Sequence, residues 1–155
     1  LEFRRVLFRS LSKRCKNLVS IEANRNWYGK TSELIKQIKG NSKVRVLLRE
    51  VNEGDIKQTD YYCNAADSTN IEFDIVIVDG VLRYECLKKG IELLSKRGGL
   101  IIADNWKQSF VWICPACEEL MSKYETQIYE QEDHKDNDGV NKWKTAVFTI
   151  PKLTN

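Results

Sequence analysis

Residues 73–80 (FDIVIVDG) and residues 98–105 (GGLIIADN) decide the fold of this chain. Each is a short apolar run without alternation of apolar and polar side chains, which is typical of a strand buried on both faces of a parallel sheet. Residues 82–94 between them have helical periodicity, with Leu87, Ile91 and Leu94 on one face. A strand, a helix and a strand in this order form a right-handed crossover unit. Both strands therefore end at the carboxyl edge of the sheet, where open α/β sheets bind ligands.

Weaker patterns on either side predict the remaining elements. Residues 18–22 and 44–48 are expected strands, residues 26–38 an expected helix, and residues 52–70 a polar loop with a short helix near residues 60–65. Further on we expect a helix at residues 110–124 and two strands, residues 127–131 and 143–150, joined by a charged turn with Asp138-Gly139. Such a turn favours an antiparallel hairpin. The predicted fold class is α/β and Rossmann-like, with a mostly parallel sheet and a C-terminal antiparallel hairpin.

Length and composition indicate one soluble globular domain. The chain has 155 residues, of which 42% are hydrophobic and 30% are charged. No apolar run approaches the ~20 residues that a membrane span needs, and the start of the chain has no secretory-signal pattern. The five cysteines form an odd, unevenly spaced set, as expected for reduced thiols. We therefore expect a cytoplasmic protein without a membrane partner.

The first ten residues, LEFRRVLFRS, resemble the in-frame translation of a short-read sequencing adapter. We expect residues 1–10 to be an artefact and residues 11–155 to be the natural domain, the alternative being a genuine basic amphipathic helix. The ten residues contain three Arg and one Glu, so they carry +2 of the net charge of +3 and leave +1 for the rest. So small a charge gives no support for a nucleic-acid partner.

With this order of elements, residues 11–151 resemble a class I S-adenosylmethionine-dependent methyltransferase. Residues 19–22 (VSIE), followed by Trp27-Tyr28, look like the second strand of that family, and residues 73–80 and 98–105 look like its fourth and fifth strands. Residues 142–148 (KWKTAVF) look like its last strand. The resemblance implies S-adenosylmethionine as the cofactor and Glu22 as the acceptor of hydrogen bonds from its ribose hydroxyls. A carboxylate suits a vicinal diol because it can accept two hydrogen bonds.

The first strand of that family and its Gly-rich turn have no counterpart in this sequence. No Gly-x-Gly precedes Glu22, and residues 1–10 occupy the place where that turn would lead into the first helix. We therefore expect a truncated methyltransferase domain with its first strand missing, which binds the cofactor weakly or not at all.

The other candidate site residues lie at two strand ends. The resemblance implies Asp79 and Asp104 as catalytic residues, Asp79 and Gly80 as cofactor-binding residues beside Glu22, and Asn105 and Trp106 as substrate-binding residues. The alternative for the acids is structural, because acids at strand ends also cap helices or accept hydrogen bonds from loop amides.

Asp79, Asp104 and Asn105 also form a candidate site for a divalent metal such as Mg²⁺. Catechol and caffeoyl-coenzyme A type O-methyltransferases hold a metal with an Asp at the first of these places and Asp-Asn at the second. This sequence departs from them after Asp79, because residues 80–83 (GVLR) supply no lysine as catalytic base. Arg83 instead offers a positive charge that can neutralise the carboxylates. The favoured expectation is therefore a site without a metal.

The favoured function is transfer of a methyl group to an oxygen or nitrogen atom of a small molecule. The alternatives are a nucleotide-binding domain of the dehydrogenase type, which also ends a strand in an acid, and a non-catalytic α/β module. The C-terminal hairpin favours the methyltransferase, since dehydrogenase domains usually continue with parallel strands. Cys114 and Cys117 form a C-x-x-C inside a helical pattern, and we expect them to be structural. The sequence does not predict an oligomeric state.

Overall fold

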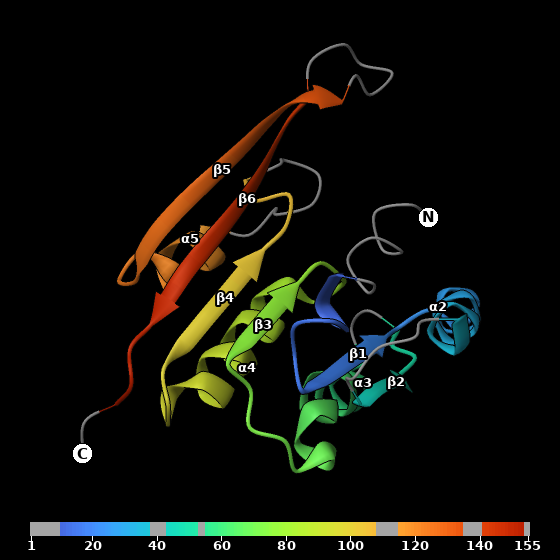
Figure 1. The fold of residues 1–155 in the computed structure, drawn as a ribbon. Coiled ribbons are helices and arrows are strands. Elements are labelled where there is room, and N and C mark those ends of the chain that lie inside the picture. The colour runs from blue at the N-terminus through green and yellow to red at the C-terminus, as the bar shows by residue number, and fades with distance from the viewer. Residues whose placement is uncertain (1–9, 38–42, 53–54, 108–114, 135–140, 154–155) are drawn as a thin grey trace. The chain divides into compact units, whose positions relative to one another are not determined.

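The computed structural model describes residues 10–37, 43–52, 55–107, 115–134 and 141–153 (Figure 1). The chain divides into two compact units, residues 1–71 and residues 72–155, each with its own strands and helices. Among the residues described, no helix is both long and apolar enough to cross a membrane.

The first unit is built around two parallel strands. β1 (Asn17–Glu22) pairs with β2 (Lys43–Leu48) in a register that places Glu22 opposite Leu48. α2 (Arg25–Gln37) connects the two strands and packs on both, as the crossover between parallel strands requires. Asn24 caps this helix, because its side-chain oxygen accepts hydrogen bonds from the backbone amides of Asn26 and Trp27, at 2.9 and 3.1 Å.

The segment after β2 is more helical than the sequence predicted. α3 (Ile56–Cys63) is followed directly by the 3-10 helix η1 (Asn64–Thr69). Asp55 caps α3 by accepting hydrogen bonds from the backbone amides of Lys57 and Gln58. Only Tyr62 of α3 is buried, so this helix lacks the apolar stripe by which helices are recognised in a sequence.

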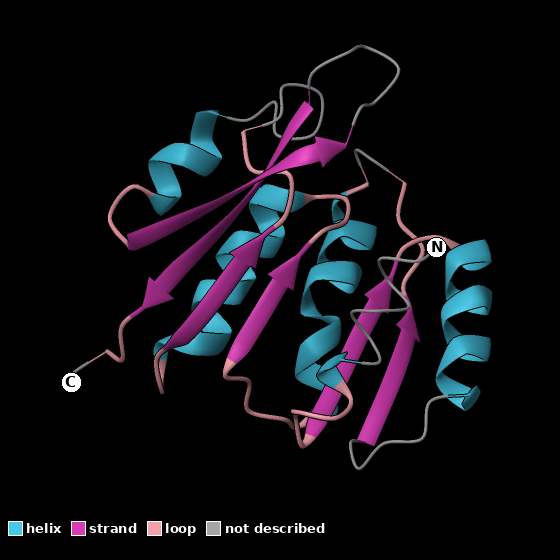
Figure 2. Ribbon diagram, turned by 45° about the horizontal axis from the view of Figure 1, so that its top comes forward, coloured by secondary structure: helices cyan, strands magenta, loops and turns pink. Residues whose placement is uncertain are grey.

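The second unit is a four-stranded sheet with two helices (Figure 2). Its strands are β3 (Ile75–Val78), β4 (Gly99–Ala103), β5 (Glu125–His134) and β6 (Asn141–Ile150), in the order β3-β4-β6-β5. β3 and β4 are parallel, whereas β6 is antiparallel to both β4 and β5. The last strand is thus inserted beside β4, which confirms the predicted α/β class with parallel strands and a C-terminal antiparallel hairpin.

The core of this unit lies between one face of the sheet and the helices α4 (Arg83–Ser95) and α5 (Pro115–Met121). Leu87 and Leu94 of α4 are fully buried, and so is Ile101 of β4. Cys117 brings α5 into the same cluster and is 1% exposed, which supports a structural role for this cysteine. Cys114 lies outside the described residues.

The sequence predicted that both faces of β3 are buried, but in the structure only one face of this strand is well covered. Val78 is 3% exposed, but Ile75 exposes 47% of its surface. Successive residues of a strand point to opposite faces of the sheet, so these two side chains belong to different faces. Within the described part of this unit, α4 and α5 both join the core cluster. The apolar run of β3 therefore has a covered side and a less covered side.

The turn into β4 depends on Gly98 and Gly99. Their φ angles are +80° and +159°, values that side chains disfavour. A Cβ atom on Gly99 would lie 2.5 Å from the carbonyl oxygen of Asp74 and 2.8 Å from Cδ2 of Leu94. The same carbonyl accepts the hydrogen bond from the amide of Leu100, at 3.0 Å, that begins the pairing of β3 with β4. The strand therefore begins at a point with no room for a side chain.

We expect Gly99→Ala to lower the free energy of unfolding by about 2–4 kcal/mol, because it adds backbone strain and overpacks the turn. Urea denaturation measures the change. Gly29→Ala is the matched control, since no atom lies within 4 Å of the added methyl group in α2. That variant should be neutral or more stable by up to ~1 kcal/mol. A Gly99→Ala protein as stable as the Gly29→Ala protein would contradict this account of the turn.

Candidate active site

The ends of β3 and β4 bring two predicted site residues to one edge of the second unit. Val78 is paired with Ala103, and the amide of Asp104 donates a hydrogen bond to the carbonyl of Val78 at 3.1 Å. Asp79 and Asp104 follow these paired residues directly. Both acids therefore lie at the carboxyl edge of neighbouring parallel strands, as the sequence indicated.

Arg83, the first residue of α4, connects these two strand ends. Its Nη1 donates to the backbone carbonyl of Asp104 at 2.5 Å, and its Nε donates to the backbone carbonyl of Gly80 at 3.0 Å. Its Nη2 lies 3.7 Å from Oδ1 of Asp79. The side chain is 11% exposed, and burial lowers the pKa of Arg83, while Asp79 and Asp104 oppose that change. The guanidinium stays charged, because arginine keeps its proton in proteins.

The carboxylate of Asp104 is held from the opposite side of β4. Its Oδ1 accepts a hydrogen bond from Oγ1 of Thr145 at 3.0 Å. Thr145 belongs to β6, which pairs with β4 on the side away from β3. Asp104 is thus held through its carbonyl by Arg83 and through its carboxylate by Thr145 of β6.

Left-handed backbone conformations occur repeatedly at this edge. Leu82, Asn105 and Lys107 have φ angles of +50°, +54° and +63°. Asparagine tolerates this region, whereas leucine and lysine pay a steric penalty there. Strained residues of this kind concentrate at functional sites, where the surrounding structure fixes them. The turns after β3 and β4 therefore hold a defined shape around the two acids.

Asn105 and Trp106 are both buried, at 7% and 5% exposed. The Trp106 ring packs edge-to-face on Phe148, with ring centroids 5.0 Å apart, and its amide donates to the carbonyl of Lys144 at 2.7 Å. Trp106 belongs to the core cluster, so packing accounts for this side chain by itself. Its predicted contact with substrate stays a prediction, as does that of Asn105.

Glu22, the predicted ribose-binding acid, ends β1 in the first unit and is 8% exposed. The hydroxyls of Ser20 and Thr31 donate to its Oε1, each at 3.4 Å. Its backbone carbonyl accepts a hydrogen bond from the amide of Arg49 at 2.9 Å. The two hydroxyls, from β1 and α2, orient the carboxylate, while the bond from Arg49 holds the backbone at the strand end.

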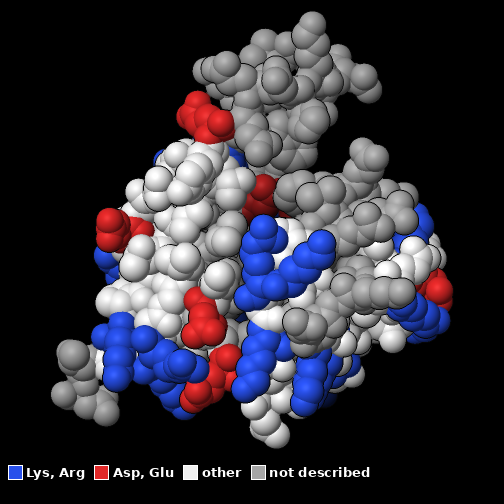
Figure 3. Space-filling view, viewed as in Figure 1, with Lys and Arg blue, Asp and Glu red and all other residues white. Residues whose placement is uncertain are grey.

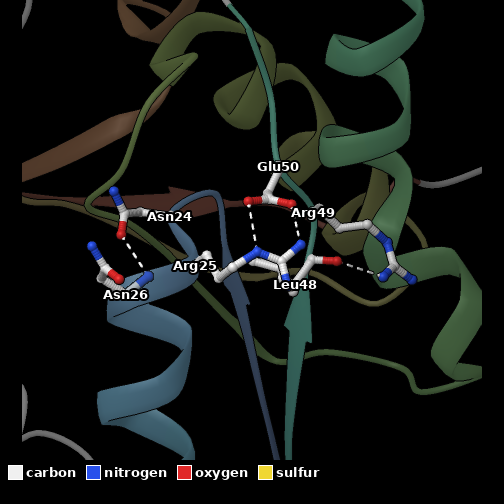
Figure 4. Close-up of polar contacts among 6 residues, drawn as sticks. All are labelled: Asn24, Arg25, Asn26, Leu48, Arg49 and Glu50. Carbon is white, nitrogen blue, oxygen red and sulfur yellow. Dashed lines mark hydrogen bonds and ion pairs between the residues drawn. The ribbon is translucent and has the colours of Figure 1, made fainter.

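An ion pair joins the segments that follow β1 and β2 (Figure 4). Arg25, the first residue of α2, donates to both carboxylate oxygens of Glu50, at 3.2 and 2.6 Å. The hydrogen bond and the charge of Glu50 raise the pKa of Arg25. Because both side chains are exposed, the pair adds little stability, but its two parallel bonds restrict how these segments move.

Sequence reasoning missed the hydroxyl partners of Asp104 and Glu22. Thr145 reaches Asp104 only because Ala146 of β6 is paired with Ala103 of β4. Thr31 reaches Glu22 because α2 packs on β1. Neither threonine has a sequence signal of its own, since each contact depends on a pairing or packing between distant segments.

Acidic and basic side chains are mixed on the face of the described residues that Figure 3 shows. This mixture agrees with a chain of 25 basic and 22 acidic residues. The absence of a nucleic-acid partner stays a prediction.

Comparison with known proteins identifies the fold. No protein-family model and no curated protein sequence matches the chain. A methyltransferase-like protein from Silicibacter pomeroyi has a TM-score of 0.60 at 11% sequence identity, over 97% of this chain and 87% of that one. A domain assigned as precorrin-6Y C5,15-methyltransferase from Corynebacterium diphtheriae has a TM-score of 0.54 at 9% identity, over 98% and 97% of the two chains. This chain therefore has a methyltransferase-like fold.

We expect Thr145→Val to lower the free energy of unfolding by about 1–2 kcal/mol, because a hydrogen bond to a carboxylate is lost while the shape is kept. Thr145→Ser retains the hydroxyl and should retain most of the stability. Urea denaturation of the two variants beside the parent chain measures the difference. A loss of stability in Thr145→Ser with none in Thr145→Val would show that the methyl group, and not the hydroxyl, supplies the stabilisation.

Proposed function

We propose that this chain is a methyltransferase domain that transfers the methyl group of S-adenosylmethionine to an oxygen or nitrogen atom of a small molecule. The fold of the second unit carries the proposal: β3, α4 and β4 form a parallel crossover, and β6 is inserted antiparallel beside β4. Methyltransferase-like structures share this fold. The antiparallel end favours methyl transfer over dehydrogenase chemistry, since dehydrogenase domains usually continue in parallel.

The orientation of Glu22 supports the cofactor assignment. Its carboxylate stands at a strand end and is oriented by Ser20 and Thr31. In this proposal Glu22 accepts hydrogen bonds from the ribose hydroxyls. Binding of the cofactor by Asp79 and Gly80 stays a prediction from the sequence. S-adenosylmethionine, when bound, supplies an electrophilic methyl group on a sulfonium sulfur.

We assign the acceptor to Asp104, Asn105 and Trp106. Methyl transfer needs the acceptor atom in line with the bond that breaks, so the main task of these residues is to position it. Asp104 is held by Arg83 and Thr145 before any ligand arrives, which lowers the cost of reorganisation. Asp79 and Asp104 are the groups we assign to accept the proton that the acceptor atom loses.

The five cysteines form an odd, unevenly spaced set. We infer a cytoplasmic enzyme, because such a set is typical of proteins from reducing compartments.

The cofactor assignment is tested by titrating S-adenosylmethionine and following saturation-transfer NMR signals of its ribose and adenine protons. We expect weak binding, since no Gly-x-Gly turn precedes Glu22, and at least about a tenfold loss of affinity in Glu22→Gln, which removes a charged acceptor. Glu33→Gln is the matched control, because Glu33 of α2 is an exposed acid paired with Lys36.

Binding that Glu22→Gln leaves unchanged would contradict the assignment of Glu22. Tight binding by the chain would show that the Gly-rich turn is dispensable. Binding of NADH in place of S-adenosylmethionine, again dependent on Glu22, would favour the dehydrogenase alternative.

A further inference from the structure

We propose that the Arg83 guanidinium is the resident cation of the edge formed by the ends of β3 and β4, and that it occupies the place a divalent metal ion would take. The juxtaposition behind this proposal is a largely buried arginine side chain that lies against one carboxylate oxygen and two backbone carbonyl oxygens at two strand ends. Arg83 is therefore a positioning residue that acts through Asp79 and Asp104.

The oxygens around Arg83 are those that a hard cation would bind. They include one carboxylate oxygen, from Asp79, and two backbone carbonyl oxygens, from Gly80 and Asp104. Carboxylates and carbonyls are the usual protein ligands of Ca²⁺ and Mg²⁺. The Arg83 side chain is 11% exposed, so it packs within the fold at this position and does not extend into solvent.

The two carboxylates of the candidate metal site do not fit a metal in this arrangement. Metal ligands must converge to ~2.0–2.6 Å from one point, but the Asp104 carboxylate is bonded to Thr145 on the β6 side of β4. Asp79 lies on the β3 side, next to Arg83. Among the described residues, no group of three or more His, Cys, Asp or Glu side chains is placed to hold a metal ion. A divalent ion would have to displace Arg83 and break its two backbone hydrogen bonds.

A consequence for the substrate follows, and it rests on the proposed methyltransferase function. Metal-dependent O-methyl transfer suits a diol whose two oxygens both bind the ion. With a guanidinium in place of the ion, the acceptor needs only one nucleophilic atom. The site is therefore suited to a single hydroxyl or an amine, not to a catechol-like pair.

The test measures cation binding alone, without cofactor or acceptor. Mn²⁺, which accepts carboxylate and carbonyl ligands, is titrated into the full chain, and free Mn²⁺ is counted by electron paramagnetic resonance. Binding at this edge is defined as the part that Asp79→Asn removes, which separates it from ions bound elsewhere. We expect no such binding in the parent chain up to about 1 mM, the weak end of protein calcium sites.

Arg83→Met keeps the length of the side chain and removes the charge. It should gain an Asp79-dependent Mn²⁺ site at least about tenfold tighter than any in the parent, because three oxygens lose their cation. Arg83→Lys keeps a positive charge and should still exclude Mn²⁺. Arg97→Met is the matched control, since Arg97 pairs with Asp74 just before β3, at the opposite end of the strand, and should produce no Asp79-dependent site.

An Asp79-dependent Mn²⁺ site in the parent chain would overturn the proposal, and so would a folded Arg83→Met protein without one. If Arg83→Met does not fold, the parent chain and Arg83→Lys decide: exclusion of Mn²⁺ from both supports the proposal, and binding in either overturns it. The Mn²⁺ titration contains no S-adenosylmethionine, so its result does not depend on the methyltransferase proposal. Failure of that proposal would appear only in the S-adenosylmethionine titration of the parent chain and Glu22→Gln.

Discussion

The close packing of α4 on β3 and β4 is the constraint on which the second unit depends. Gly90 permits it: a Cβ atom there would lie 3.1 Å from Cδ1 of Ile101 and 3.2 Å from Cγ1 of Val76. The helix can therefore approach the sheet closely, with Leu87 fully buried. At this separation the first residue of the helix, Arg83, reaches the ends of both strands. The position of the charge at the candidate site is thus set by the packing of the core beneath it.

Sequence reasoning located the elements with strong apolar patterns and lost accuracy where the pattern weakens. The helix expected at residues 82–94 is α4, Arg83–Ser95, and the crossover around it was predicted correctly. The hairpin was also correct, but β5 extends over Glu125–His134 instead of residues 127–131, because its polar residues give no apolar signal. Where the structure has α3, the sequence predicted only a short helix near residues 60–65, because the polar residues of α3 also give no apolar signal. Residues 110–114 of the expected helix at 110–124 lie outside the described residues, and α5 begins at Pro115.

At the candidate site, the sequence predicted positions along strands but not the contacts between distant segments. The rule that parallel strands end at one edge was enough to place Asp79 and Asp104 together. The bond from Thr145 to Asp104 depends on the pairing of β4 with β6, which no local pattern encodes. The side chain of Trp106 was assigned to a substrate pocket because it follows Asn105. The structure adds a contact that the sequence did not predict, because the ring packs edge-to-face on Phe148. Its contact with substrate stays a prediction.

A cation that belongs to a helix differs physically from a bound metal ion. An ion can leave its ligands while the fold persists, whereas Arg83 is attached to α4 and moves only if that helix moves. Its hydrogen bonds to the carbonyls of Gly80 and Asp104 also hold the turns in which Leu82 and Asn105 have left-handed backbones. Strain in those turns persists only when the surroundings over-determine it. The same guanidinium therefore neutralises charge at the edge and fixes the backbone that presents Asp79 and Asp104, so the electrostatics of the site and the geometry of its turns cannot be changed independently.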